Sequence, residues 1–208
     1  MKVLLFFCVL GMAAAAPSAH FSNITQFVAH MERDEYEGYL KIVKESTSLP
    51  YIPNEYFGFL QTLTESDYDD LVFIAKARDA IQNIRPVVFL QAWDLLKRWN
   101  PELHQAGEKA FDSFSSRINE EGQNGKISRN VYNTISWLVR TGAGAPVHPN
   151  GEESMNLYIH NVLREVKQFN EQEKAEVDTL FPELSKLAER IDELPSNYNF
   201  LTTIPVYF

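Results

Sequence analysis

The sequence predicts an all-α protein, folded as a single compact domain of several helices. Apolar residues recur at spacings of three and four along most of the chain, which is the pattern of helices that bury one face. Several of these stretches begin with a serine, threonine or asparagine that can cap a helix, and others begin beside a proline. No convincing pair of alternating strands interrupts them before the C-terminal tail.

The first sixteen residues predict a secretory signal peptide. Lys2 supplies a positive start, residues 3–10 form an apolar stretch, and residues 11–16 are mostly small residues that suit signal peptidase. We therefore expect residues 17–208 to be secreted as an extracellular protein. Cys8, the only cysteine, lies in the peptide, so the mature core is held without disulfides. No apolar run reaches the roughly 18 residues of a membrane span, which predicts no stable membrane insertion.

The chain is acidic, with a formal net charge of −9 from 19 basic and 28 acidic residues. Binding of nucleic acid depends on basic patches that neutralise phosphate, so the charge argues against nucleic acid as a partner. It also disfavours an anionic membrane surface as the resting partner. The single Asn-x-Ser/Thr sequon, at Asn23, predicts a glycosylation site in an exported protein.

Three helices are expected in the N-terminal part. Ser22 can cap the first, and prolines at both ends of residues 48–53 break the apolar run that follows it. Aromatic residues cluster after Pro53 and predict a short helix over residues 54–62. Thr64-Glu65-Ser66-Asp67 then resembles a capping box and begins a helix to about Ala80. The apolar positions of the first run are Ile24, Phe27, Val28, Met31, Tyr36, Tyr39, Leu40 and Val43.

Two further helices are expected before a glycine turn. Arg85-Pro86 begins a helix that ends at Trp99, and Asn100-Pro101-Glu102 combines a cap, a proline and an acid at the start of another. That helix runs to about Glu121, and residues 122–125 form the turn.

The C-terminal part is expected to hold the remaining helices and one long loop. Ser128 caps a helix to Arg140, and residues 141–151 are rich in glycine and proline, as in a loop. A regular amphipathic helix follows over residues 152–169. Asn170 caps the next, and Pro182 limits it before a last helix over residues 183–194.

The helix expected after Pro86 is apolar on two sides. Phe89, Trp93 and Leu96 form one row, and a second row runs beside it through Ala92 and Trp99. Such a helix needs apolar neighbours on both sides, which are either other helices or a bound apolar ligand. Periodicity alone leaves both interpretations open. The stretch from Leu71 to Ala75 poses the same choice.

The sequence contains no recognisable catalytic or cofactor-binding motif. Its histidines, at positions 20, 30, 104, 148 and 160, include no His-Glu-x-x-His motif and no pair at i, i+4, so no metal is expected. A Gly-x-Ser-x-Gly nucleophile motif is missing, and the mature chain has no thiol. We therefore expect a binding protein without a cofactor, and not an enzyme.

Three arginines are candidate partners for a ligand carboxylate. Arg78, Arg85 and Arg140 each lie near an expected helix end beside strongly apolar sequence. A guanidinium group there can bind a carboxylate through two parallel hydrogen bonds. An ordinary surface ion pair is the alternative role for each.

Two stretches resemble the nematode fatty acid- and retinol-binding proteins, a secreted, helix-rich family. The first runs from Ile52-Pro53-Asn54-Glu55-Tyr56 through Phe59 to Leu63-Thr64-Glu65-Ser66-Asp67 and Leu71. The second is Phe169-Asn170-Glu171-Gln172, then Ala175 and Leu180-Phe181-Pro182. Between them, Pro101-Glu102-Leu103 and Glu108-Lys109 fit in order. The similarity covers about residues 49–194 and leaves an additional N-terminal stretch, 17–48, and an apolar tail, 195–208.

The resemblance implies helices around an internal apolar cavity that takes up long-chain fatty acids and retinol, without catalysis. It favours the ligand interpretation of the two-sided helices, because such a cavity needs apolar faces toward both core and ligand. Chosen by helical spacing, the expected lining residues are Phe57, Leu60, Leu71, Ile74, Phe89, Trp93, Leu96, Ile135, Leu138, Ile159 and Val162.

A secreted helical protein that binds another protein, in the manner of a host-directed effector, is the alternative. Exposed aromatic residues in the N-terminal stretch or the C-terminal tail would favour it, because contiguous apolar patches mark interfaces. Transient contact with a membrane or a host protein is compatible with either function.

Overall fold

The described part of the chain is all-α, which confirms the predicted class. The computed structural model describes residues 28–29, 31–84, 92–142 and 151–193, without the side chains at 78–79, 81–84, 92–93, 137–142 and 151–158. No residue in these ranges lies in a strand. The helices are α3 (Arg33–Glu45), α4 (Asn54–Thr62), α5 (Glu65–Ile84), α6 (Ala92–Trp99), α7 (Pro101–Gln123), α8 (Arg129–Gly142), α9 (Gly151–Lys167), α10 (Glu171–Leu180), α11 (Leu184–Glu189) and the 3₁₀ helix η2 (Ile191–Glu193).

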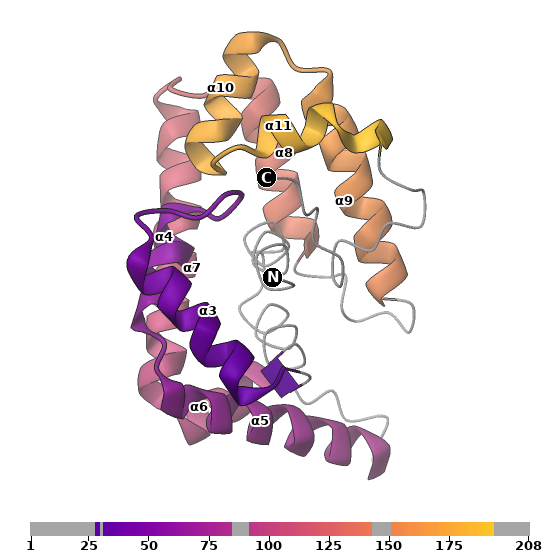
Figure 1. Ribbon diagram of the computed structural model, residues 1–208. Helices are drawn as coiled ribbons and strands as arrows, with labels where there is room; N and C mark the ends of the chain where they lie inside the picture. Colours follow the sequence, from indigo (N-terminus) through magenta and orange to yellow (C-terminus); the bar gives the residue numbers. More distant parts are fainter. Residues whose placement is uncertain (1–27, 30, 85–91, 143–150, 194–208) are drawn as a thin grey trace.

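Helix α7, with 23 residues, is the longest described helix and connects the two ends of the molecule. Helix α4 packs along it, α6 packs against it near its start, and α8 packs against it near its end. Helices α3 and α5 complete one end, and α9, α10 and α11 complete the other (Figure 1). The described helices therefore follow a curved path, with α5 and α9 at its two extremes.

Local capping explains where several helices begin. The Asn100 side chain accepts a hydrogen bond from the Leu103 amide (3.0 Å), and the Ser128 hydroxyl accepts one from the Val131 amide (3.2 Å). Asn170 and Glu173 form a reciprocal pair, in which each side chain accepts the other's backbone N–H at 2.9 and 3.0 Å. These caps confirm the predicted starts of α7, α8 and α10, because each satisfies an amide that the helix leaves unpaired.

Some predicted boundaries are wrong. Residues 31–32 interrupt the first predicted apolar run, because α3 begins at Arg33, where the Glu35 carboxylate accepts the Glu32 amide hydrogen at 3.1 Å. The predicted start at Ser22 lies outside the described residues. Helix α5 continues beyond Ala80 to Ile84. The predicted last helix is two shorter pieces, α11 and η2, and Arg190 lies between them.

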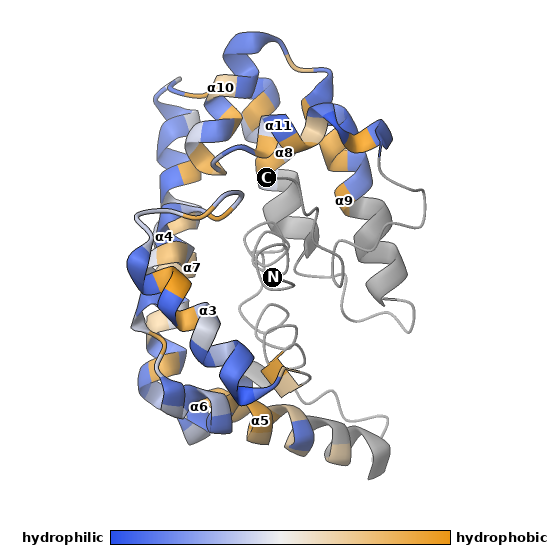
Figure 2. Cartoon of the chain, in the orientation of Figure 1, coloured by the Kyte–Doolittle hydropathy of each residue, from blue (hydrophilic) through white to orange (hydrophobic). Residues whose placement is uncertain are grey.

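Two apolar clusters form the core. The N-terminal cluster lies among α3, α4, α5, α6 and the start of α7, and the C-terminal cluster lies among α8 to α11, η2 and the end of α7. Figure 2 shows hydrophobic residues where α11 meets α8 and α9, and hydrophilic residues along the outer side of α10. The N-terminal cluster comprises Val28, Met31, Tyr36, Tyr39, Leu40, Val43, Leu49, Ile52, Phe57, Phe59, Leu60, Leu63, Leu71, Ile74, Leu96, Leu103 and Ala110. The C-terminal cluster comprises Phe114, Ile118, Ile127, Val131, Ile135, Ile159, Val162, Leu163, Val166, Phe169, Val177, Leu180, Phe181, Leu184, Leu187, Ala188 and Ile191.

A junction of aromatic rings connects the two clusters. Tyr56 packs against both, and its ring meets Phe114 edge-on with the centroids 5.5 Å apart. Phe114 meets Phe181 in the same way at 5.3 Å. Beside these rings the Tyr51 amide donates to the Pro182 carbonyl at 2.6 Å, which joins the loop before α4 to the turn before α11. Edge-on rings at such distances attract one another, so the junction stabilises the contact between the two halves.

Candidate ligand-binding site

The expected lining residues whose side chains are described are all buried. Each is 6% exposed or less, which fits either a packed core or the wall of an apolar site. They do not gather in one cluster, however. Phe57, Leu60, Leu71, Ile74 and Leu96 belong to the N-terminal cluster, and Ile135, Ile159 and Val162 belong to the C-terminal cluster. The two sets lie toward the two ends of α7, because α6 packs against α7 near its start and α8 packs against it near its end.

The remaining candidates lie outside the described residues or side chains. Phe89 and Arg85 belong to residues 85–91, which the structure does not describe. Trp93, Leu138, Arg78 and Arg140 lie in described helices, but their side chains are outside the description. The expected signal peptide, residues 17–27 of the N-terminal stretch with Asn23, and the C-terminal tail are also outside the described ranges.

Tyrosine hydroxyls supply polar groups at the edge of the N-terminal cluster. Tyr36 donates to the Thr64 carbonyl at 3.1 Å, and Tyr68 donates to the Met31 carbonyl at 2.7 Å. Burial raises the pKa of Tyr36, and the charge of Asp67 adds to the effect. The Tyr36 hydroxyl thus stays protonated, and both hydroxyls serve as donors that satisfy backbone carbonyls near helix ends.

His104 is buried beside the same cluster. Its side chain belongs to the α7 turn that also carries Leu103, and the residue is 3% exposed. Its Nδ1 lies 3.4 Å from a carboxylate oxygen of Glu108. Burial lowers the pKa of His104, while Glu108 opposes that change. The environment therefore favours a neutral imidazole in the core over a charged one. Spacing alone gave no sign of this burial.

Arg117 is the residue that the sequence analysis missed. Its Nε lies 2.7 Å from one Glu55 oxygen, its Nη2 donates to the other at 3.0 Å, and its Nη1 donates to the Thr179 carbonyl at 3.1 Å. The guanidinium carbon is 5.6 Å from the Phe114 ring centre. Arg117 of α7 thus connects α4 with the end of α10 beside the aromatic junction of Tyr56, Phe114 and Phe181. Both partners are 62 residues away in sequence, so no local pattern predicts the contact.

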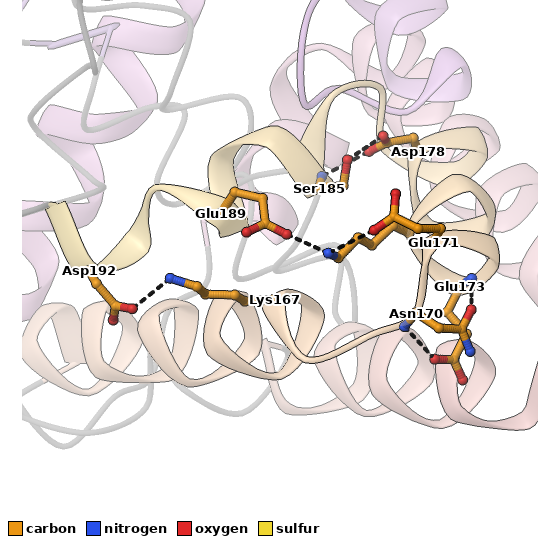
Figure 3. Close-up of polar contacts among 9 residues, drawn as sticks. Lys167, Asn170, Glu171, Glu173, Asp178, Ser185, Glu189 and Asp192 are labelled. Atoms are coloured by element: carbon orange, nitrogen blue, oxygen red, sulfur yellow. Dashed lines mark hydrogen bonds and ion pairs between the residues drawn. The ribbon is translucent and has the colours of Figure 1, made fainter.

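Hydrogen bonds and ion pairs connect the helices on the outer side of the C-terminal cluster (Figure 3). Lys174 pairs with Glu171 and Glu189, and these contacts raise the pKa of Lys174 and lower that of Glu189. Asp178 accepts the Ser185 amide at 2.8 Å and the hydroxyl of the same residue. In addition, Lys167 on α9 bonds Asp192 on η2 at 2.6 Å. Together they fix α10, α11 and η2 over α9, which is a structural role.

Comparison with models of known families, with curated proteins and with solved structures finds no match. Among the described residues no three histidine, cysteine, aspartate or glutamate side chains are grouped so as to hold a metal ion. None of the described helices combines the length and the hydrophobicity needed to cross a bilayer.

Proposed function

We propose that this protein is a secreted carrier that holds long-chain fatty acids and retinol in an apolar interior between its helices. The observation that supports the proposal most directly is the burial of every described candidate lining residue among other apolar side chains. Enclosure of an acyl chain there is favourable by about 0.8 kcal/mol for each CH₂ group removed from water. Apolar contact can thus supply most of the affinity without catalysis or a cofactor.

The polar end of the ligand needs a hydrogen-bonding partner or access to water, because an unpaired buried carboxylate is costly. Arg78, Arg85 and Arg140 are our proposed partners for it. Their guanidinium groups match a carboxylate in both charge and geometry. Retinol, which carries a hydroxyl group, needs such a charge less than a fatty acid does.

Binding of a fluorescent fatty acid analogue tests the proposal. Protein made from the full-length chain in secretory eukaryotic cells is delipidated and mixed with the probe. Transfer of the probe to an apolar site enhances its emission and shifts it to the blue, and oleate or retinol reverses both changes by displacement. An unchanged emission at micromolar protein refutes the carrier function. Native mass spectrometry of the sample before delipidation identifies any lipid that co-purifies.

A matched pair of variants distinguishes a residue that contacts the ligand from one that only packs in the core. Leu96 and Leu40 both belong to the N-terminal cluster and are at most 2% exposed, but only Leu96 is a candidate lining residue. Replacement of either by alanine costs about 2–5 kcal/mol of stability through lost contacts and a new cavity. Only Leu96→Ala is expected to change the probe affinity as well. Equal probe affinities in the two variants would place the ligand away from Leu96.

One observation favours the second candidate function, that of a protein that binds another protein. Phe73 and Trp99 are large apolar residues that stay about half exposed, at 47% and 55%. Exposed aromatic residues are frequent at protein interfaces. A folded, delipidated sample that binds neither probe nor natural lipid but captures a defined protein through these residues would support this alternative.

A further inference from the structure

Phe73 of α5 and Trp99 of α6 form a stacked aromatic pair at the surface. Their ring centroids are 4.2 Å apart, and the ring planes are inclined by 29°. Both side chains remain about half exposed, whereas Leu71, Ile74 and Leu96 on the same helices are at most 1% exposed. The two helices thus turn one apolar face toward the N-terminal cluster and present a second, smaller one to the solvent.

Hydrogen bonds hold the indole of this pair in place. The Trp99 Nε1–H donates to one oxygen of Asp70 at 2.7 Å, and the Asn100 amide group donates to the other at 2.9 Å. Asn100 is also the cap of α7, whose first turn it fixes through the Leu103 amide. The polar edge of the indole is therefore satisfied within the fold. Its hydrocarbon face stays available, which is the arrangement of tryptophan at membrane interfaces.

The charges around the pair are mixed. Asp69 and Lys76 lie four residues before and three residues after Phe73, on the same side of α5, and both are exposed. Asp69 is paired with Arg33 of α3, which adds a second cation on this side. The rim therefore carries both signs of charge, although the whole chain has a net charge of −9. Such a rim matches a surface whose headgroups also carry both signs.

We propose that the Phe73–Trp99 pair docks the protein onto zwitterionic phospholipid surfaces, where the rings enter the interfacial layer. Cations of the rim then face phosphate groups, and carboxylates face the headgroup ammonium. The net negative charge of the chain opposes anionic bilayers, so the occupant is a neutral one. Docking at the membrane would let the carrier load and unload its ligand, and this loading role rests on the proposed function. The docking itself is independent of the proposed function.

Flotation with vesicles of pure phosphatidylcholine tests the docking directly. Protein made from the full-length chain in secretory cells is expected to float with the vesicles. The double variant Phe73→Ala/Trp99→Ala is expected to lose about tenfold or more of its partition, because two aromatic side chains no longer leave water. Replacing part of the lipid by phosphatidylserine should weaken binding of the parent protein, since the net charge is negative.

Two controls keep the result specific. Ile42→Ala removes an apolar side chain of α3 that is exposed to a similar degree, 51%, and should leave flotation unchanged. The variant Phe73→Leu/Trp99→Leu keeps apolar side chains at both positions and should restore part of the partition. Circular dichroism confirms that each variant is folded. A parent protein that does not float, or a double alanine variant that floats equally well, overturns the proposal.

Probe transfer distinguishes a failure of docking from a failure of the carrier function. A docked carrier delivers the fluorescent fatty acid to vesicles at a rate that increases with vesicle concentration, and the double alanine variant loses that dependence while still binding probe in buffer. Absence of probe binding in buffer refutes the carrier function and leaves flotation to decide on docking. Transfer at a rate independent of vesicle concentration overturns the loading role. Capture of a protein by the pair, without flotation, overturns the membrane assignment.

Discussion

Two glycines inside helices show how strongly a single position depends on its surroundings. A Cβ atom built at Gly38 in α3 meets nothing within 4 Å, whereas one built at Gly122 in α7 overlaps the Tyr132 ring. We expect Gly38→Ala to raise the free energy of unfolding by about 0.5–1 kcal/mol, because alanine has less backbone freedom to lose. Gly122→Ala should lower it, because the Tyr132 ring must move. Urea denaturation followed by circular dichroism measures both, and a gain at Gly122 contradicts the packing.

His104 makes stability depend on pH. Burial lowers the pKa of His104 in the folded state below its ordinary value of 6.5. The unfolded chain therefore takes up a proton first as the pH falls, and stability that is present above about pH 6.5 is lost below it. Nearby Glu108 and Asp94 oppose the change in pKa, and Lys97 adds to it. The loss of stability ends at the lower pH where His104 is protonated in the folded protein too.

The measurement compares the parent protein with His104→Gln by urea denaturation at about pH 7.5 and about pH 5.5. We expect the parent to lose more free energy of unfolding over this interval than the variant, which has no group to protonate at position 104. Equal losses in the two proteins would show that His104 does not contribute.

At the scale of an element, the start of α5 depends on one carboxylate. Asp67 is 8% exposed and accepts both the amide and the hydroxyl hydrogen of Thr64, at 2.6 and 2.8 Å. Asp67→Ala removes both hydrogen bonds from the helix start, and we expect a loss of about 1–2 kcal/mol in the free energy of unfolding. Asp69→Ala, two residues on, removes only an exposed ion pair with Arg33 and should cost less than about 1 kcal/mol. Urea denaturation of both variants is the test, and equal losses would contradict the capping role.

The short range of capping contacts explains which helix boundaries the sequence could predict. Caps act within four residues, so Asn100, Ser128 and Asn170 identified the starts of their helices correctly. The start of α3 was not predicted, because Glu35 bonds the Glu32 amide there and no serine, threonine or asparagine marks the position. Helix α5 continues to Ile84 because the residues after Ala80 form no stop signal that competes with four more helical residues.

At the scale of the whole molecule, Arg117 holds the two halves together. It is paired with Glu55 of α4 and donates to the Thr179 carbonyl of α10. We expect Arg117→Ala to lower the free energy of unfolding by about 2 kcal/mol, because a partly buried carboxylate and a carbonyl lose a charged partner. Arg129→Ala, at an exposed position of α8, should change it by less than about 0.5 kcal/mol. Urea denaturation measures both variants. An Arg117 variant as stable as the parent would show that the aromatic rings alone maintain the junction.

The candidate site was only partly predictable, because its residues come from helices that are far apart in the sequence. Helical spacing identified buried positions correctly, since each described candidate from Phe57 to Val162 is nearly inaccessible to solvent. It did not indicate that these positions divide between two clusters, because spacing reports which side of a helix is apolar and not which helix lies opposite. The exposed Phe73 and Trp99 illustrate the limit, since both are as apolar in sequence as their buried neighbours.

The sequence by itself determined that the described chain is helical, where many of its helices begin, and which of their faces are buried. These properties arise from contacts within a few residues, namely caps, turn residues and side chains one turn apart. Only the tertiary structure decided that α7 carries two clusters, that Arg117 connects them, and that an aromatic pair stays outside. Those features join residues tens of positions apart, and no local pattern encodes which distant surfaces meet.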